Sequence, residues 1–83
     1  MKQTMKRETF EIKANGVVFD TRSKWNSSIR SIESKVNEIA KVESTVYELV
    51  DSHSEKEGFY NVRGFRVWKG RNGNVIKFEV EKK

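Results

Sequence analysis

The sequence contains few side chains of the types that catalyse reactions. Its one histidine, His53, lies in the segment Asp51-Ser52-His53-Ser54, which combines the residue types of a hydrolytic triad. Neighbours along a chain point in different directions, however, whereas a triad needs side chains that converge. One histidine without any cysteine also falls short of the three or four ligands of a zinc site. We therefore expect a protein that is not an enzyme and that uses no metal or other cofactor.

Residue types suited to binding gather near the C-terminus. The net charge is +5, and residues 58–83 contain seven Lys or Arg against two Asp or Glu, so this segment accounts for the whole excess. Aromatic side chains interleaved with cations are typical of surfaces that bind single-stranded nucleic acid, where rings stack on bases and cations meet phosphates. The candidate nucleic-acid-binding residues are Tyr60, Arg66, Trp68, Lys69, Arg71 and Lys77.

Two other interpretations of this segment stay open. The aromatic residues can instead pack on another element or subunit, with the charges keeping a sheet edge soluble. The protein can also be a modulator or inhibitor that binds an acidic surface of another protein through its helix or its C-terminal hairpin. The composition, rich in Lys, Asn and Ser and without Cys or Pro, suggests a phage-type protein that acts on a host factor.

Asn-Gly pairs between alternating apolar residues predict two β-hairpins, because a type I′ turn needs a positive φ at both central residues. The first spans residues 8–21 around Asn15-Gly16, with the pairs Ala14–Val17, Ile12–Phe19 and Phe10–Thr21. The second spans residues 58–82 around Asn72-Gly73. Its expected core-facing pairs are Lys69–Ile76, Val67–Phe78 and Phe65–Val80, with Arg66–Glu79 and Trp68–Lys77 on the outer face.

Between the hairpins the hydrophobic period becomes helical. An apolar stripe with steps of four and three predicts a helix over residues 23–56, capped by Thr21 or Ser23 and ended by Gly58; its members are Trp25, Ile29, Ile32, Val36 and Ile39. Glu43 interrupts the stripe, so a bend at residues 43–45 is an alternative. The β-branched residues of segment 45–50 would also suit a strand, but the surrounding pattern favours helix.

These elements predict one α+β domain over residues 1–83, with ββαββ order and a four-stranded antiparallel sheet packed on the helix; residues 1–6 are expected to be flexible. A helix over 23–56 would be about 50 Å long, while the strands reach only about 25–30 Å. Its second half would need cover, which predicts a homodimer. The expected interface is Val46, Tyr47, Leu49 and Val50. A break at 43–45 that folds the second segment back would give a monomer instead.

Several features bear on location. The chain has no cysteine and no apolar run of the roughly 18 residues that a membrane span requires. The basic segment Met1–Arg7 is not followed by the apolar stretch of a signal peptide. We therefore expect a cytoplasmic protein that does not associate with membranes.

Overall fold

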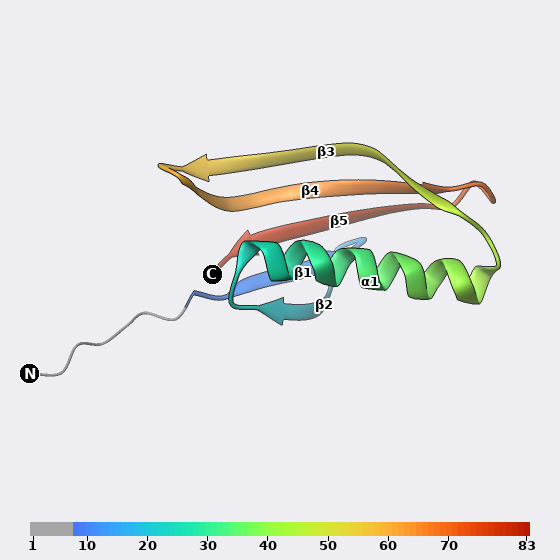
Figure 1. Cartoon of the computed structure of the whole chain (residues 1–83), viewed down its shortest axis with the longest axis horizontal. Helices are drawn as coiled ribbons and strands as arrows, with labels where there is room; N and C mark the ends of the chain where they lie inside the picture. The colour runs from blue at the N-terminus through green and yellow to red at the C-terminus, as the bar shows by residue number, and fades with distance from the viewer. Residues whose placement is uncertain (1–7) are drawn as a thin grey trace, which may run out of the picture.

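A computed structural model describes residues 8–83, and the predicted flexibility of residues 1–6 falls outside this range. The elements follow in the order β1 (Phe10–Ala14), β2 (Val17–Arg22), α1 (Trp25–Glu43), β3 (Tyr47–Glu57), β4 (Tyr60–Gly70) and β5 (Val75–Lys82). The strands form one antiparallel sheet of five in the order β2-β1-β5-β4-β3 (Figure 1). The predicted ββαββ fold with a four-stranded sheet was therefore wrong; the order is ββαβββ.

The predicted helix over 23–56 was too long, because α1 ends at Glu43. Ser44 adopts the left-handed conformation with φ of 52°, which ends a helix by reversing the backbone. The amide groups of Ser44 and Thr45 then bond to the carbonyl oxygens of Lys41 and Ala40, which satisfies two groups of the last turn. The end of the helix is thus a turn of defined geometry and not a bend.

Residues beyond that turn form β3 and not the second half of a helix. The β-branched segment 45–50 suits a strand, and pairing along β4 satisfies the backbone on one side of β3. At the other end of the helix neither predicted cap is used. Lys24 occupies the N-cap position, and no side chain bonds to the first free amides.

The Glu43 carboxylate joins the helix end to two other segments. It accepts hydrogen bonds from the Tyr47 hydroxyl at the start of β3 and from the side-chain amides of Asn72 and Asn74 in the β4–β5 connection. The bond from Tyr47, with those from the two amides, lowers the pKa of Glu43 below its ordinary value. Glu43, which interrupts the apolar stripe, therefore connects the end of α1 to the start of β3 and to the β4–β5 connection.

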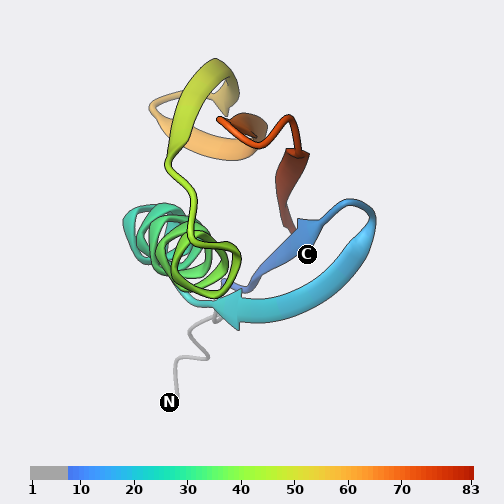
Figure 2. The ribbon, with the colours of Figure 1, turned by 90° about the vertical axis from the view of Figure 1, so that its right-hand side faces the viewer.

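The core lies between α1 and the side of the sheet that faces it. The apolar stripe of the helix packs there as predicted, and the sheet curls around the helix (Figure 2). The buried apolar residues are Phe10, Ile12, Ile32, Val36, Tyr47, Ile76, Phe78 and Val80. Each strand contributes side chains to the core. Strand β3 does so only through Tyr47, because every later residue of the strand is exposed.

The first hairpin forms around the predicted Asn15-Gly16 turn, with φ of 49° and 85° at the two residues. Ala14 pairs with Val17 as expected, but a bulge between Ile12 and Lys13 shifts the pairs beyond it. Ile12 and Phe10 therefore face Asp20 and Arg22 and not Phe19 and Thr21. The shift replaces an unfavourable Glu11–Asp20 pair with Glu11–Thr21, and the Asp20 carboxylate accepts a hydrogen bond from Ser31 of α1.

The second hairpin has a different register from the predicted one. Four residues, 71–74, connect the strands in place of a two-residue turn, and the Gly70 amide bonds to the Asn74 carbonyl oxygen at 2.8 Å. The observed pairs are Trp68–Ile76, Val67–Lys77, Arg66–Phe78, Phe65–Glu79 and Gly64–Val80. The β4 side chains from Arg63 to Lys69 therefore point to the side of the sheet opposite to the one predicted, because neighbouring positions alternate between the two faces.

Trp25 closes the core at the start of the helix. Its ring meets Phe10 edge-on, with centroids 5.9 Å apart, and lies against the backbone of Gly64 in β4. A Cβ atom on Gly64 would lie 2.4 Å from the His53 carbonyl oxygen and 3.0 Å from Cη2 of Trp25. The close approach of β3, β4 and the indole ring therefore requires glycine at this position.

We expect Gly64→Ala to destabilise the protein by about 1–3 kcal/mol, because the added methyl group must displace backbone or the indole ring. Urea unfolding followed by circular dichroism measures the change. Lys69→Ala, at an exposed position of the same strand, is the control and should stay within about 0.5 kcal/mol of the parent. Equal stability of the Gly64→Ala variant and the parent would contradict this packing.

Candidate interaction surface on the open side of the sheet

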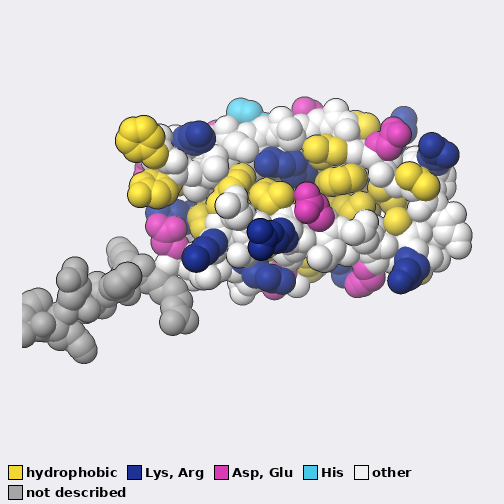
Figure 3. Space-filling model, in the orientation of Figure 1, with side chains coloured by type: hydrophobic (Ala, Val, Ile, Leu, Met, Phe, Trp, Pro, Cys, Tyr) yellow, Lys and Arg dark blue, Asp and Glu magenta, His cyan; other side chains and the backbone are white. Residues whose placement is uncertain are grey.

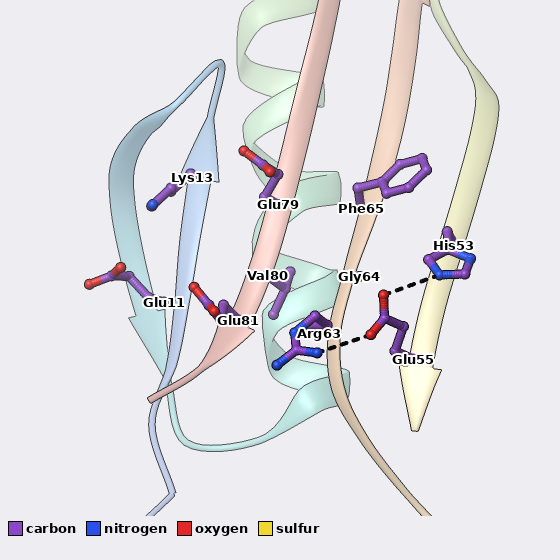
Figure 4. Close-up of a pocket in the computed structure, with 10 residues that line it drawn as sticks. All are labelled: Glu11, Lys13, His53, Glu55, Arg63, Gly64, Phe65, Glu79, Val80 and Glu81. Carbon is purple, nitrogen blue, oxygen red and sulfur yellow. Dashed lines mark hydrogen bonds and ion pairs between the residues drawn. The ribbon is translucent and has the colours of Figure 1, made fainter. Parts of the chain in front are cut away.

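The sheet has one side covered by α1 and one side open to solvent. Cross-strand partners share a face, so the pairs Phe65–Glu79, Arg63–Glu81 and Lys13–Glu79 place their side chains together on the open side. Figure 4 looks onto this side, with the helix behind the strands. A hollow of about 280 Å³ opens there, lined by Glu11, Lys13, His53, Glu55, Arg63, Gly64, Phe65, Glu79, Val80 and Glu81.

Glu55 is the centre of the polar contacts at the β3 end of this hollow. Its carboxylate accepts a hydrogen bond from Arg63 at 3.0 Å and lies 3.5 Å from Nε2 of His53 (Figure 4). The Arg63 guanidinium lowers the pKa of Glu55 below its ordinary value. A general base or acid works best with a pKa near the working pH, so this shift makes Glu55 less suited to proton transfer and better suited to binding a cation.

Phe65 is an aromatic residue of the open side that contacts a cation and a second ring. The Lys77 ammonium lies 5.0 Å from its ring centroid, and the His53 ring lies 5.5 Å away, tilted by 32°. Sequence reasoning missed Phe65 because it assigned the opposite face of β4, and it missed His53 as its neighbour because it placed residues 23–56 in a helix. A four-residue connection at 71–74 in place of a two-residue turn would have given Phe65 the correct face.

The six predicted nucleic-acid-binding residues lie in four separate regions. Arg66 and Trp68 face the helix side, where both are half-buried. The Arg66 guanidinium lies 6.0 Å from the Trp25 ring and donates to the His53 and Phe65 carbonyl oxygens. Trp68 packs against the core, and its buried Nε1 has no hydrogen-bond partner among the described residues.

The other four are exposed but not adjacent. Tyr60 follows the β3–β4 turn and is 72% exposed, beside Phe59 at 92%. Figure 3 shows hydrophobic side chains at this tip. Lys69 and Arg71 lie at the far end of β4. Lys77 stands on the open side over Phe65. The structure therefore does not assemble the predicted stacking surface.

The open side is more acidic than basic. Cross-strand pairing and alternation give it seven carboxylates, from Glu11, Glu48, Asp51, Glu55, Glu57, Glu79 and Glu81. The cations are five, from Lys13, Arg63, Lys69, Lys77 and Lys83, the last in an ion pair with Glu11. The basic excess of the sequence therefore does not appear as a basic platform on this side. A polyanion binds most tightly to a surface on which cations outnumber carboxylates.

The outer edge of β3 is the longest free edge of the sheet. Strand β3 pairs only with β4, and every residue from Glu48 to Glu57 is exposed. A bulge at Val50 interrupts the strand, the register against β4 shifts again between Glu55 and Lys56, and the turn at Gly58 ends the strand. The stretch Asp51–Glu57 between them is therefore an extended backbone with one free hydrogen-bonding edge.

Three of the four predicted dimer residues are exposed near the start of β3. Val46, Leu49 and Val50 have exposed fractions of 52%, 47% and 55%. Tyr47, in contrast, is buried and donates its hydroxyl to Glu43, so it belongs to the core of one chain.

Other kinds of site find no support in the described part of the chain. Within residues 8–83 no three His, Cys, Asp or Glu side chains are grouped so that they could hold a metal ion. In the same range no helix is both long and apolar enough to cross a membrane. No protein-family model, curated protein or solved structure matches this chain.

We expect replacement of Arg63 by Met to raise the pKa of the Glu55 carboxyl toward its ordinary value, because the hydrogen bond and the positive charge that stabilise the carboxylate are both removed. A ¹³C NMR titration of the side-chain carboxyl resonances measures the shift. Lys69→Met removes a cation elsewhere on β4 and should leave Glu55 unchanged. An unaltered Glu55 titration in Arg63→Met would show that the pair does not form in solution.

Proposed function

We propose that this protein is a small, non-catalytic binding module that takes up an extended segment of a partner protein on the free edge of β3. It would act in this way as a modulator or inhibitor of that partner. The observation that supports the proposal is the edge itself, a run of exposed backbone from Asp51 to Glu57 that no other described element covers.

Strand addition uses the hydrogen-bonding groups that an edge strand leaves free. A partner segment that pairs with β3 gains main-chain hydrogen bonds along the edge and side-chain contacts at alternate positions. Strand β4 supports this edge from behind, because it pairs with both β3 and β5. The residues of β3 that would bind the partner are therefore already extended before the partner arrives, which lowers the entropy cost of binding.

The properties of β3 also favour selective pairing. It has 11 residues, while strands of about five or six are most common and free edges are usually kept short. Charged residues and a bulge are the means by which edges avoid indiscriminate association. On β3 these means leave a stretch of free edge between the bulge at Val50 and the turn at Gly58, with one shift of the register against β4 between Glu55 and Lys56.

Binding of single-stranded nucleic acid is the second candidate. The observation that favours it is Phe65 on the open side, with Lys77 over its ring and His53 beside it. Such a group can stack a base and contact a phosphate. We rank this function second, because the carboxylates that surround Phe65 on the same side outnumber the cations and repel a polyanion.

The proposed location is the cytoplasm, on the ground that a chain of this size without cysteine uses no disulfide to stabilise its fold.

Strand addition predicts a specific pattern of backbone dependence. Extended peptides can be selected for binding from a random displayed library, and each selected peptide can then be N-methylated one amide at a time. We expect methylation at alternate positions, whose N–H groups face β3, to abolish binding, while methylation between them has little effect. Hydrogen exchange should show new protection in Asp51–Glu57. A lack of alternation, or protection that falls elsewhere, would refute strand addition.

A labelled single-stranded oligonucleotide tests the second candidate under the same conditions. Affinity better than about 10⁻⁴ M at low salt, lost in Phe65→Ala and falling steeply with added salt, would favour nucleic acid over a peptide. The matched variant is Val67→Ala, on the same strand and face but without the aromatic ring.

Homodimer formation also stays a prediction. The long helix that first motivated it does not exist, and the chain reverses at Ser44 and returns along the sheet, which is the break for which the sequence predicted a monomer. The remaining ground for a dimer is that Val46, Leu49 and Val50 are each exposed. Sedimentation equilibrium distinguishes the monomer mass of 9.7 kDa from twice that value. If these residues hold a dimer together, Leu49→Glu should dissociate it, because a twofold contact would bury the new charge twice. A monomer mass at tens of micromolar would contradict the dimer, and Val17→Glu, at an exposed site on β2, is the control.

A further inference from the structure

The side chains along the free part of β3 differ between its two faces. Asp51, His53 and Glu55 pair with Val67, Phe65 and Arg63 and therefore stand on the open side of the sheet. The residues between them, Ser52 and Ser54, pair with Arg66 and Gly64 and point toward the helix side. On the open side, a strand added to this edge would meet the carboxylates of Asp51 and Glu55 with His53 between them. On the helix side it would meet the small hydroxyl groups of Ser52 and Ser54.

The carboxylates of β3 are only partly balanced by their own sheet. The strand contains Glu48, Asp51, Glu55 and Glu57 against Lys56, which gives a net charge of −3 with His53 neutral. Arg63 forms an ion pair with Glu55 at 3.0 Å. Asp51 and Glu57 face Val67 and Tyr60 across the strands, and neither forms an ion pair among the described residues.

This charge decides between the possible occupants of the edge. A second copy of β3 would bring a strand of charge −3 against another of the same charge, and like charges opposite each other destabilise a sheet. A nucleic acid strand is repelled for the same reason. A segment with Lys or Arg on its open side would instead set cations within about 5 Å of Asp51 and its neighbours.

We infer that the occupant of the β3 edge is an extended segment of another protein with Lys or Arg at every second position and small or β-branched residues between them. This inference rests on the proposed strand addition. The cations lie on the open side beside Asp51, Glu55 and Glu57. The intervening residues lie on the helix side beside Ser52 and Ser54, whose short side chains leave room for Thr or Val.

Four synthetic peptides of equal length test the pattern by fluorescence anisotropy with the full chain. The first alternates Lys with Thr and Val, the second has Glu in place of Lys, and the third has Gln. The fourth has the composition of the first with its Lys residues consecutive. We expect the alternating Lys peptide to bind most tightly, the Gln and consecutive-Lys peptides more weakly, and the Glu peptide least.

A variant of the protein tests the contribution of the β3 carboxylates to peptide binding. The double substitution Asp51→Asn and Glu57→Gln should weaken binding of the alternating Lys peptide by roughly twofold to fivefold for each carboxylate removed. Binding of the Gln peptide should not change. The difference between parent and variant should shrink at high salt, where exposed charges are screened. Glu38→Gln, which removes a carboxylate from α1 near β2, is the matched control.

The outcomes separate this inference from the proposed function. Equal or tighter binding of the Gln peptide, with alternating sensitivity to N-methylation, would keep strand addition and overturn the basic pattern. Equal binding of the consecutive-Lys peptide would also overturn it, because charge alone would then suffice. Failure of both these peptides and the peptides selected from the library to bind would overturn strand addition itself.

Discussion

The hydrogen bonds to the Glu43 carboxylate are the contacts on which the arrangement of this protein depends. One carboxylate at the end of α1 accepts bonds from Tyr47 and from the amides of Asn72 and Asn74. It therefore connects the end of the helix, the first residue of β3 and the β4–β5 connection. The backbone supports the same junction, because the Arg71 amide donates to the Val46 carbonyl oxygen at 2.9 Å. With the chain reversed at Ser44, this junction sets β3 beside β4.

Much of the local structure follows from the sequence, but the extent of the helix does not. The Asn15-Gly16 pair is a turn signal, and the apolar stripe of α1 has a period that fits only a helix. Residues 45–50 are ambiguous, because Val46, Leu49 and Val50 share a face of a helix and are also good strand residues. The deciding factor is tertiary. The hydrogen bonds at Glu43 and the free edge of β4 both favour an extended chain there, and neither is visible in a local pattern.

The candidate surface was harder to predict than the fold, because it depends on register. An Asn-Gly pair is the strongest hairpin signal, yet at residues 72–73 it lies inside a four-residue connection. That difference places Trp68 and Arg66 toward the helix and Phe65 toward solvent. Composition correctly located aromatic and basic residues in the C-terminal segment. It could not show that their neighbours on β1, β3 and β5 would bring an excess of carboxylates to the same side.

The bulge at Val50 and the turn at Gly58 limit the free edge at both ends. The seven residues between them, 51–57, are about 23 Å long at the rise of an extended chain. An added strand finds no matching backbone beyond either limit, so a longer partner segment would gain no further main-chain bonds. In the proposed strand addition, the edge would therefore select its partner segment by length as well as by charge.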